Sequence, residues 1–153
     1  MKHRISSGAI VVVDDRVLLV RHSKQSSYDF WVAPGGGIIN EEDIYTAAVR
    51  EVLEETGLSV DPIKPVCLEQ FYQPGLQHIK TWVLCEYVAG EISVAAHEAV
   101  REYIVEAQFM SESQVSGLNK PLFPDLLKKQ FWIDLRQGFP EFKYLGNRAM
   151  EFY

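Results

Sequence analysis

Residues 35–58 read GGGIINEEDIYTAAVREVLEETGL, and this stretch decides how the rest of the chain is interpreted. The glycines come first, and the segment from Asp43 to Thr56 that follows them has no Pro or Gly and is rich in Ala, Val, Leu and Glu. That composition, with Gly57 as a stop signal, predicts one helix. We therefore expect a glycine turn followed by a helix that ends near Gly57.

The expected helix carries a cluster of carboxylates. Glu51, Glu54 and Glu55 share one face, because residues three and four positions apart are neighbours on a helix. Like charges on adjacent turns repel, and the helix dipole disfavours anions in the last turn. A solvated acidic face, with Arg50 paired to Glu54, is the simplest interpretation. Because the helix follows a glycine turn, we favour a hard divalent cation, since Mg²⁺ binds carboxylates together with substrate phosphates.

The same stretch resembles the Nudix box, the signature of the Nudix hydrolases. The residues that carry the resemblance are Gly36, Glu42, Arg50, Glu51, Glu54, Glu55 and Gly57, with aliphatic residues at Val52 and Leu58. The segment at 30–34, FWVAP, is similar to the Trp-x-x-Pro-Gly-Gly approach of these proteins. Two positions depart from the pattern: Ile39 stands where many members have Glu, and Glu41 where many have Gly. A Gly there often serves positive φ, so Glu41 predicts a different loop path or strain.

The resemblance implies a fold, a metal site and an activity. The fold would be of the α+β class, an α/β/α sandwich with a central mixed β-sheet. The carboxylates of Glu51, Glu54 and Glu55, with the backbone carbonyl of Gly35, would hold Mg²⁺ or Mn²⁺, and Arg50 with Glu42 would orient them. Such a site hydrolyses a nucleoside diphosphate linked to another group. The metal neutralises the pyrophosphate and lowers the pKa of a water, and a carboxylate accepts its proton.

Outside the box, single residues carry weaker functional predictions. Glu98 precedes the last expected strand, where many relatives have a further metal ligand or general base. An ordinary exposed Glu is the alternative interpretation, and Glu102 is a rival. Aromatic residues on strands are more often core than stacking platforms for a base. The expected catalytic set is Glu51, Glu54, Glu98 and Arg50, and the expected substrate contacts are Gly36, Gly37, Tyr28, Phe30 and Pro74.

Pro74 bears on the substrate. It lies sixteen residues past Leu58, and a Pro at about that distance resembles the ADP-ribose pyrophosphatase subgroup. A plain hairpin turn at Gln73-Pro74-Gly75 explains it equally well. We expect ADP-ribose or a related nucleoside diphosphate sugar as substrate. The alternatives are a nucleoside triphosphate pyrophosphohydrolase that clears damaged nucleotides, and a non-catalytic nucleotide-sensing domain, against which the intact carboxylate set argues.

The length, composition and charge of the whole chain limit its possible folds and partners. Its 153 residues, 47% hydrophobic and 24% charged, predict one globular domain over residues 1–153. A net charge of -6 counts against a nucleic acid partner. The resemblance implies a small nucleotide as the ligand. We see no export signal and no run long enough for a membrane span, and we expect a cytoplasmic location. Cys67 and Cys85 lie in apolar runs and are expected to be buried reduced thiols.

The remaining segments give a coarse secondary-structure prediction. Apolar residues at three- and four-residue spacing predict one amphipathic helix from Leu122 to Leu135, with Pro124 in its first turn. The aromatic tail, which includes Phe142 and Phe152, is expected to pack on the body or on a second subunit, as in a homodimer. Strands are expected at 5–13, 17–21, 60–72 with interruptions at Pro62 and Pro65, 78–88, 92–95 and 103–105, a polar loop at 23–29, and a charged connection at 96–102.

Overall fold

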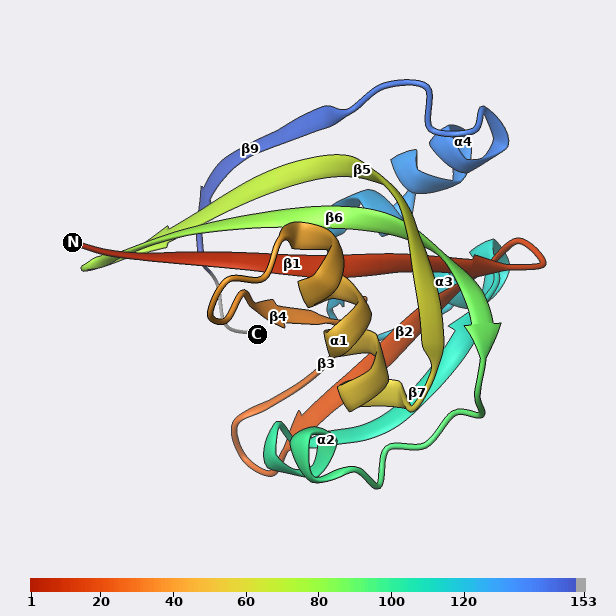
Figure 1. Cartoon of the computed structure of the whole chain (residues 1–153), viewed down its shortest axis with the longest axis horizontal. Helices are drawn as coiled ribbons and strands as arrows, with labels where there is room; N and C mark the ends of the chain where they lie inside the picture. The colour runs from red at the N-terminus through yellow and green to blue at the C-terminus, as the bar shows by residue number, and fades with distance from the viewer. Residues whose placement is uncertain (151–153) are drawn as a thin grey trace.

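The structure is a computed structural model that describes residues 1–150. In chain order its elements are β1 (Lys2–Val13), β2 (Arg16–Lys24), β3 (Tyr28–Val32), β4 (Gly35–Gly37), α1 (Ile44–Thr56), β5 (Ser59–Gln73), β6 (Leu76–Ala89), α2 (His97–Arg101), β7 (Ile104–Met110), α3 (Glu112–Ser116), β8 (Leu122–Phe123), the 3₁₀ helix η1 (Asp125–Lys128), α4 (Gln130–Arg136) and β9 (Lys143–Ala149) (Figure 1).

The strands form one curled, mixed sheet with β1 at its centre (Figure 1). β1 pairs in parallel with β6, and antiparallel with β2 and β4. β5 and β6 form a long antiparallel hairpin, and β9 joins β5 in parallel. On the other side of β1, β2 pairs with β3 and β7, and β8 joins β3. The order along the sheet is β8-β3-β2-β1-β6-β5-β9.

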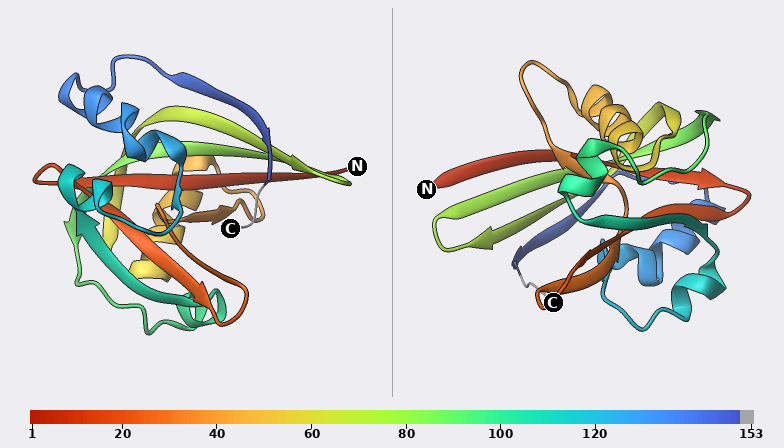
Figure 2. Two further views of the ribbon diagram at one scale, coloured as in Figure 1. Left: turned by 180° about the vertical axis from the view of Figure 1, so that it is seen from behind. Right: turned by 90° about the horizontal axis from the view of Figure 1, so that it is seen from below.

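Helices cover both faces of this sheet (Figure 2). Alternate residues of β1 point to opposite faces, as the strand period requires. Ala9 and Val11 pack in one core with Val52 of α1. Ile10 packs on the other face in a second core with Phe131 of α4. These two cores confirm the expected mixed sheet between helices.

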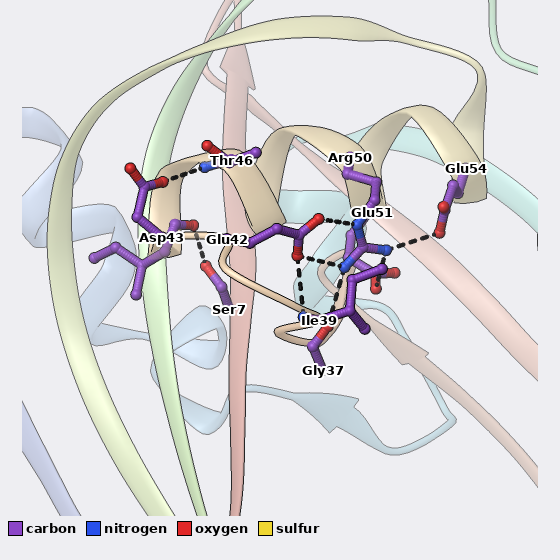
Figure 3. Close-up of polar contacts among 10 residues, drawn as sticks. Ser7, Gly37, Ile39, Glu42, Asp43, Thr46, Arg50, Glu51 and Glu54 are labelled. Atoms are coloured by element: carbon purple, nitrogen blue, oxygen red, sulfur yellow. Dashed lines mark hydrogen bonds and ion pairs between the residues drawn. The ribbon is translucent and has the colours of Figure 1, made fainter.

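The predicted helix is confirmed, and it ends at Gly57 as the sequence indicates, while the structure adds a cap at its start. The Asp43 carboxylate accepts a hydrogen bond from the Thr46 N–H, 2.7 Å away, and Gly57 ends the helix in the left-handed conformation with φ of 78°. The Ser7 hydroxyl of β1 donates to the Ile44 carbonyl at 2.6 Å (Figure 3). The first turn of α1 is therefore fixed directly to the central strand.

The prolines of β5 bend this strand without ending it. The pairing of β5 with β6 shifts register next to Pro62 and again next to Pro65, which is where a strand can accommodate a residue that lacks an N–H. Pro74 and Gly75 form the two-residue turn of the hairpin, so the turn interpretation of this segment is confirmed. Cys67 and Cys85 are buried free thiols, as expected.

Three predictions between residues 23 and 102 are wrong. No strand forms at 92–95: the Ser93 N–H donates to the Thr56 carbonyl, so this segment caps the end of α1. The predicted charged connection at 96–102 contains the short helix α2. The predicted loop at 23–29 is only a turn, because β2 continues to Lys24 and β3 begins at Tyr28.

The predicted helix from Leu122 to Leu135 is also wrong. Leu122 and Phe123 are extended and pair with β3, and helical structure begins only after Pro124. The residue before a proline is disfavoured in helical conformation, which explains the late start. η1 and α4 then follow as two short pieces that meet at Lys129. The apolar spacing identified core residues correctly, but these residues belong to three separate elements, β8, η1 and α4.

The aromatic tail packs on the body through its backbone, as the strand β9 beside β5. The side chains of Phe142 and Tyr144 stay 53% and 60% exposed. Phe152, which the tail prediction included, lies outside the described residues. None of the helices in the described part of the chain is long and apolar enough to cross a membrane.

Candidate metal and substrate site

The glycine turn lies directly against the carboxylate face of α1. β4 brings Gly35 to the end of the helix, where its N–H donates to Glu55 Oε1 at 3.2 Å. A Cβ on Gly36 would lie 2.4 Å from Glu51 Oε1, so a larger residue here would force the Glu51 carboxylate to move. Glycine therefore allows the backbone of the turn and this carboxylate to approach closely.

Three carboxylates converge beside this turn. One oxygen each of Glu51, Glu55 and Glu102 lies within 4.8 Å of the others. Glu51 and Glu55 are 5% and 1% exposed. Burial raises the pKa of Glu55 well above its usual value, and the charges of Glu51 and Glu102 raise this pKa further. Burial also raises the pKa of Glu102, with Glu51 again contributing.

This cluster fits a divalent cation. Glu55 Oε2 is buried and has no hydrogen-bond partner in residues 1–150. A buried polar atom is normally satisfied, and a buried carboxylate is costly unless it is paired or coordinates a metal. Oxygen ligands at this density are what Mg²⁺ and Mn²⁺ bind. A cation in the cluster would pair the orphan oxygen and offset the repulsion.

Arg50 organises the other side of the carboxylates (Figure 3). Its Nη1 donates to Glu51 Oε1 and to Glu54 Oε2, both at 3.0 Å. Its Nη2 donates to the Gly37 carbonyl and to Glu42 Oε2, both at 3.0 Å, and its Nε also donates to Glu42. These bonds lower the pKa of Glu42 and raise that of Arg50. One guanidinium thus links the helix to the glycine turn.

The structure brings most of the predicted site residues together, but the carboxylate that joins Glu51 and Glu55 in the cluster is Glu102. Glu54 lies on the same helix face and is held by Arg50. Glu98 lies in the first turn of α2, outside the three-carboxylate group. Glu102 ends α2, and its carbonyl is 3.1 Å from His22 Nδ1 in a hydrogen bond. His22 was not predicted as a site residue, and no spacing pattern in the sequence indicates it.

The predicted aromatic contacts lie next to the same end of the sheet. Phe30 stacks on the His22 ring with 5.1 Å between centroids, and Tyr28 contacts Phe30 at 5.6 Å. Pro74, in contrast, is at the tip of the β5–β6 hairpin, away from the glycine turn along β6. A direct substrate contact for Tyr28, Phe30 or Pro74 stays a prediction.

The loop between the glycine turn and α1 does not place Glu41 in a positive-φ conformation. The positive φ, 53°, falls on Asn40, and Glu41 is not among the residues with positive φ. Asn tolerates this conformation better than most residues, so the loop turns one residue earlier. The Ile39 N–H donates to Glu42 Oε2 at 3.2 Å, which ties the loop to the Arg50 network.

The NUDIX domain family model matches residues 2–131. The chain belongs to this family. A Nudix hydrolase structure from Nitrosomonas europaea has a TM-score of 0.78 at 19% identity and covers 98% of this chain and 81% of that one. A structure described as an ADP-ribose pyrophosphatase from Streptococcus suis has a TM-score of 0.62 at 22% identity, covering 92% and 98%. At these identities the likeness to the Nudix structures shows the fold alone.

Among curated proteins, Nudix hydrolase 2 of Arabidopsis thaliana is 24% identical over 136 residues, which are 87% of this chain and 47% of that protein. The match to putative nudix hydrolase 1 of Caenorhabditis elegans is 41% over 56 residues and 15% of that protein. This Nudix chain therefore spans less than half of the length of both curated relatives.

Proposed function

We propose that this protein hydrolyses the pyrophosphate bond of a nucleoside diphosphate linked to another group, with a divalent cation bound beside α1. The observation that carries the proposal is the buried cluster of Glu51, Glu55 and Glu102, with the orphan oxygen of Glu55. Membership of the Nudix family supports the reaction class.

The cation ligands would be the Gly35 carbonyl with carboxylates of Glu51, Glu54, Glu55 and Glu102. When bound, the cation would neutralise charge on the pyrophosphate and lower the pKa of a water. Arg50 acts by holding Glu51 and Glu54 in place through its paired hydrogen bonds, and Glu42 fixes Arg50 in turn. We propose Mg²⁺ as the cation, with Mn²⁺ as its substitute.

A carboxylate must also accept a proton from the attacking water. The sequence favoured Glu98 as this base or as a further ligand, with Glu102 as its rival. The location of Glu102 within the cluster supports the rival, because a general base has to come within hydrogen-bond reach of the water. We therefore propose that Glu102 takes the role that the sequence assigned to Glu98.

For the substrate we propose ADP-ribose or a nucleoside diphosphate sugar. The spacing of Pro74 from the box, which the ADP-ribose pyrophosphatase subgroup shares, supports this choice, although Pro74 itself forms the β5–β6 turn. The name of the Streptococcus suis structure is in line with it. A small nucleotide would then be the main partner. A cytoplasmic location and a homodimer stay predictions.

The test is to incubate the purified protein with a panel of nucleotides and Mg²⁺ and to separate the products by chromatography. ADP-ribose should give AMP and ribose 5-phosphate, and chelation of the metal should stop the reaction. Glu54→Gln should lower turnover by several orders of magnitude, whereas the exposed Glu86→Gln serves as a matched control.

If only triphosphates are consumed, with release of pyrophosphate, the proposed substrate class is wrong. If no nucleotide is consumed, the reaction itself is contradicted.

A further inference from the structure

Lys80 of β6 reaches the glycine turn from the sheet. Its partner in the parallel pairing with β1 is Ser6. The ammonium Nζ lies 3.1 Å from the place where a Cβ on Gly35 would be. Burial lowers the pKa of Lys80, whereas the charges of Glu69, Glu55 and Glu51 raise it, so the side chain lies within electrostatic range of the carboxylate cluster. Lys80 was not predicted as a site residue, because it falls far from the box in sequence.

The end of the Lys80 side chain lies over the ring of the buried Trp82. Nζ lies 4.3 Å from the centroid of the Trp82 ring, a cation–π contact. Trp82 is 1% exposed, and its indole N–H donates to Glu69 Oε1 at 2.8 Å. A Cβ on Gly8 would come within 2.3 Å of the Trp82 ring, so glycine at this position leaves room for that ring.

The Lys80 ammonium has no hydrogen bond and no ion pair within residues 1–150. Two other cations near the site are already paired with carboxylates: Arg50 bonds to three glutamates, and Arg148 pairs with Asp125 and Glu69. An ammonium offers three donors, and a half-buried one without an acceptor loses hydration without compensation. This arrangement leaves a positive charge available to an anion from outside the protein.

A simple counter-ion role for Lys80 fits the geometry less well. If Lys80 only neutralised Glu55 or Glu69, its ammonium should contact one of these carboxylates directly, and no such ion pair forms within the described chain. Arg4 adds a second positive charge at the other end of the turn, with guanidinium atoms 3.8 Å from the Cβ position of Gly37. Positive charge therefore lies at both ends of the Gly35–Gly37 turn.

We propose that Lys80 is a substrate-binding residue that donates a charge-assisted hydrogen bond to a non-bridging oxygen of the substrate's pyrophosphate beside the Gly35 turn. The inference rests on the proposed function, because it assigns this pyrophosphate to the same site. Hydrogen bonds between an ammonium and a phosphate are among the stronger ones in proteins. Lys80 thus contributes to affinity for the phosphates and not to the affinity for the metal.

The test measures anion binding and metal binding separately. Imidodiphosphate, which has no hydrolysable P–O–P bond, is titrated into the protein with saturating Mg²⁺ by calorimetry, and Mn²⁺ binding without the anion is followed by electron paramagnetic resonance. Lys80→Met should weaken imidodiphosphate binding by roughly tenfold or more, while Mn²⁺ binding stays equal or tightens. Lys80→Arg should restore part of the anion affinity. Lys2→Met, on an exposed lysine of the neighbouring strand, is the matched control.

The inference is overturned if Lys80→Met binds imidodiphosphate within about twofold of the wild type, since a direct charged contact is worth more than that. It is also overturned if Mn²⁺ binding is lost in parallel, because Lys80 would then act through the metal site. Should Lys80→Met fail to fold, Lys80→Gln keeps a polar side chain and is read by the same two measurements. Failure of the proposed function is distinguishable, because the wild type would then bind imidodiphosphate through Lys80 and hydrolyse no nucleotide.

Discussion

At the scale of single residues, Glu55 carries the strongest physical indication of function. It is almost completely buried, one of its oxygens is unpaired within the described chain, and Glu51 and Glu102 stand beside it. A buried carboxylate without a partner is costly, because it must either give up hydration as a charge or take up a proton, so stability alone does not explain it. The neighbouring Arg50 pairs with Glu42, Glu51 and Glu54 and forms no ion pair with Glu55, which leaves Glu55 available to the proposed cation.

The two candidate carboxylates of α2 can be separated by paired variants. Glu102→Gln should lower kcat by about a hundredfold or more, because it removes either the base or a ligand from the cluster, and Glu98→Gln should stay near the wild type. A Mg²⁺ titration of each variant distinguishes the roles: if Glu102 is a ligand, added metal restores part of the rate, and if it is the base, it does not. A disabled Glu98→Gln beside a normal Glu102→Gln would reinstate the assignment made from the sequence.

At the scale of elements, the parallel strands β1 and β6 lie next to the site, because β1 also pairs with β4. Across this pair, Ser6 and His78 are joined by a buried hydrogen bond of 2.7 Å between Oγ and Nε2. Burial, together with the positive charges of Lys80 and Arg4, lowers the pKa of His78 to about 4. His78 is therefore neutral in the folded protein near pH 7, and protonation would oppose the packing of the two strands.

This strand pair should make folding sensitive to acid. An unfolded His titrates near pH 6.5, so the unfolded state binds more protons between about pH 6.5 and 4. Stability from His78 is fully present above pH 6.5 and is lost as the pH falls toward 4, by up to roughly 3 kcal/mol. Urea unfolding between pH 7 and 4.5 should show a shallower loss in His78→Gln than in the wild type, with the exposed His97→Gln as control. Equal slopes in all three proteins would contradict the assignment.

At the scale of the whole molecule, the site exists only in the folded chain. Its oxygens come from β4, from α1 and from the end of α2, which are separated by up to 67 residues between Gly35 and Glu102. The sheet places these segments together, because β4 pairs with β1 and β7 pairs with β2. Unfolding must therefore destroy the proposed metal site.

Divalent cations should accordingly raise the thermal stability of the protein. A ligand that binds only the folded state stabilises it by about 2.7 kcal/mol at a hundredfold excess over its Kd. For a chain of this size, that corresponds to a rise in Tm of roughly 5–10 °C. Melting curves with EDTA, Mg²⁺ and Mn²⁺ provide the measurement, and the rise should be absent in Glu51→Gln. An unchanged Tm at millimolar metal in the wild type would argue against the cluster as a cation site.

The sequence by itself determined the parts of this protein that depend on local geometry. The glycine turn, the helix and the shared face of Glu51, Glu54 and Glu55 follow from local composition, from the helical period and from the stop residue Gly57, within 23 positions. The same short range carries the family pattern, so fold class and family could be predicted from it. Core residues such as Leu122 and Phe131 were also identified, because apolar character predicts burial whichever element a residue joins.

Only the tertiary structure decided which distant residues complete the site. Glu102 joins the cluster and Glu98 does not, because the choice depends on how α2 ends against His22. Lys80 lies beside Gly35 because the register of β1 with β6 brings it there, and register is set by pairing across more than seventy residues. Another long-range pairing, that of β8 with β3, drew Leu122 and Phe123 into a strand against their helical spacing. Local periodicity specifies which residues are neighbours on one element, whereas contacts between elements are fixed by packing of the whole chain.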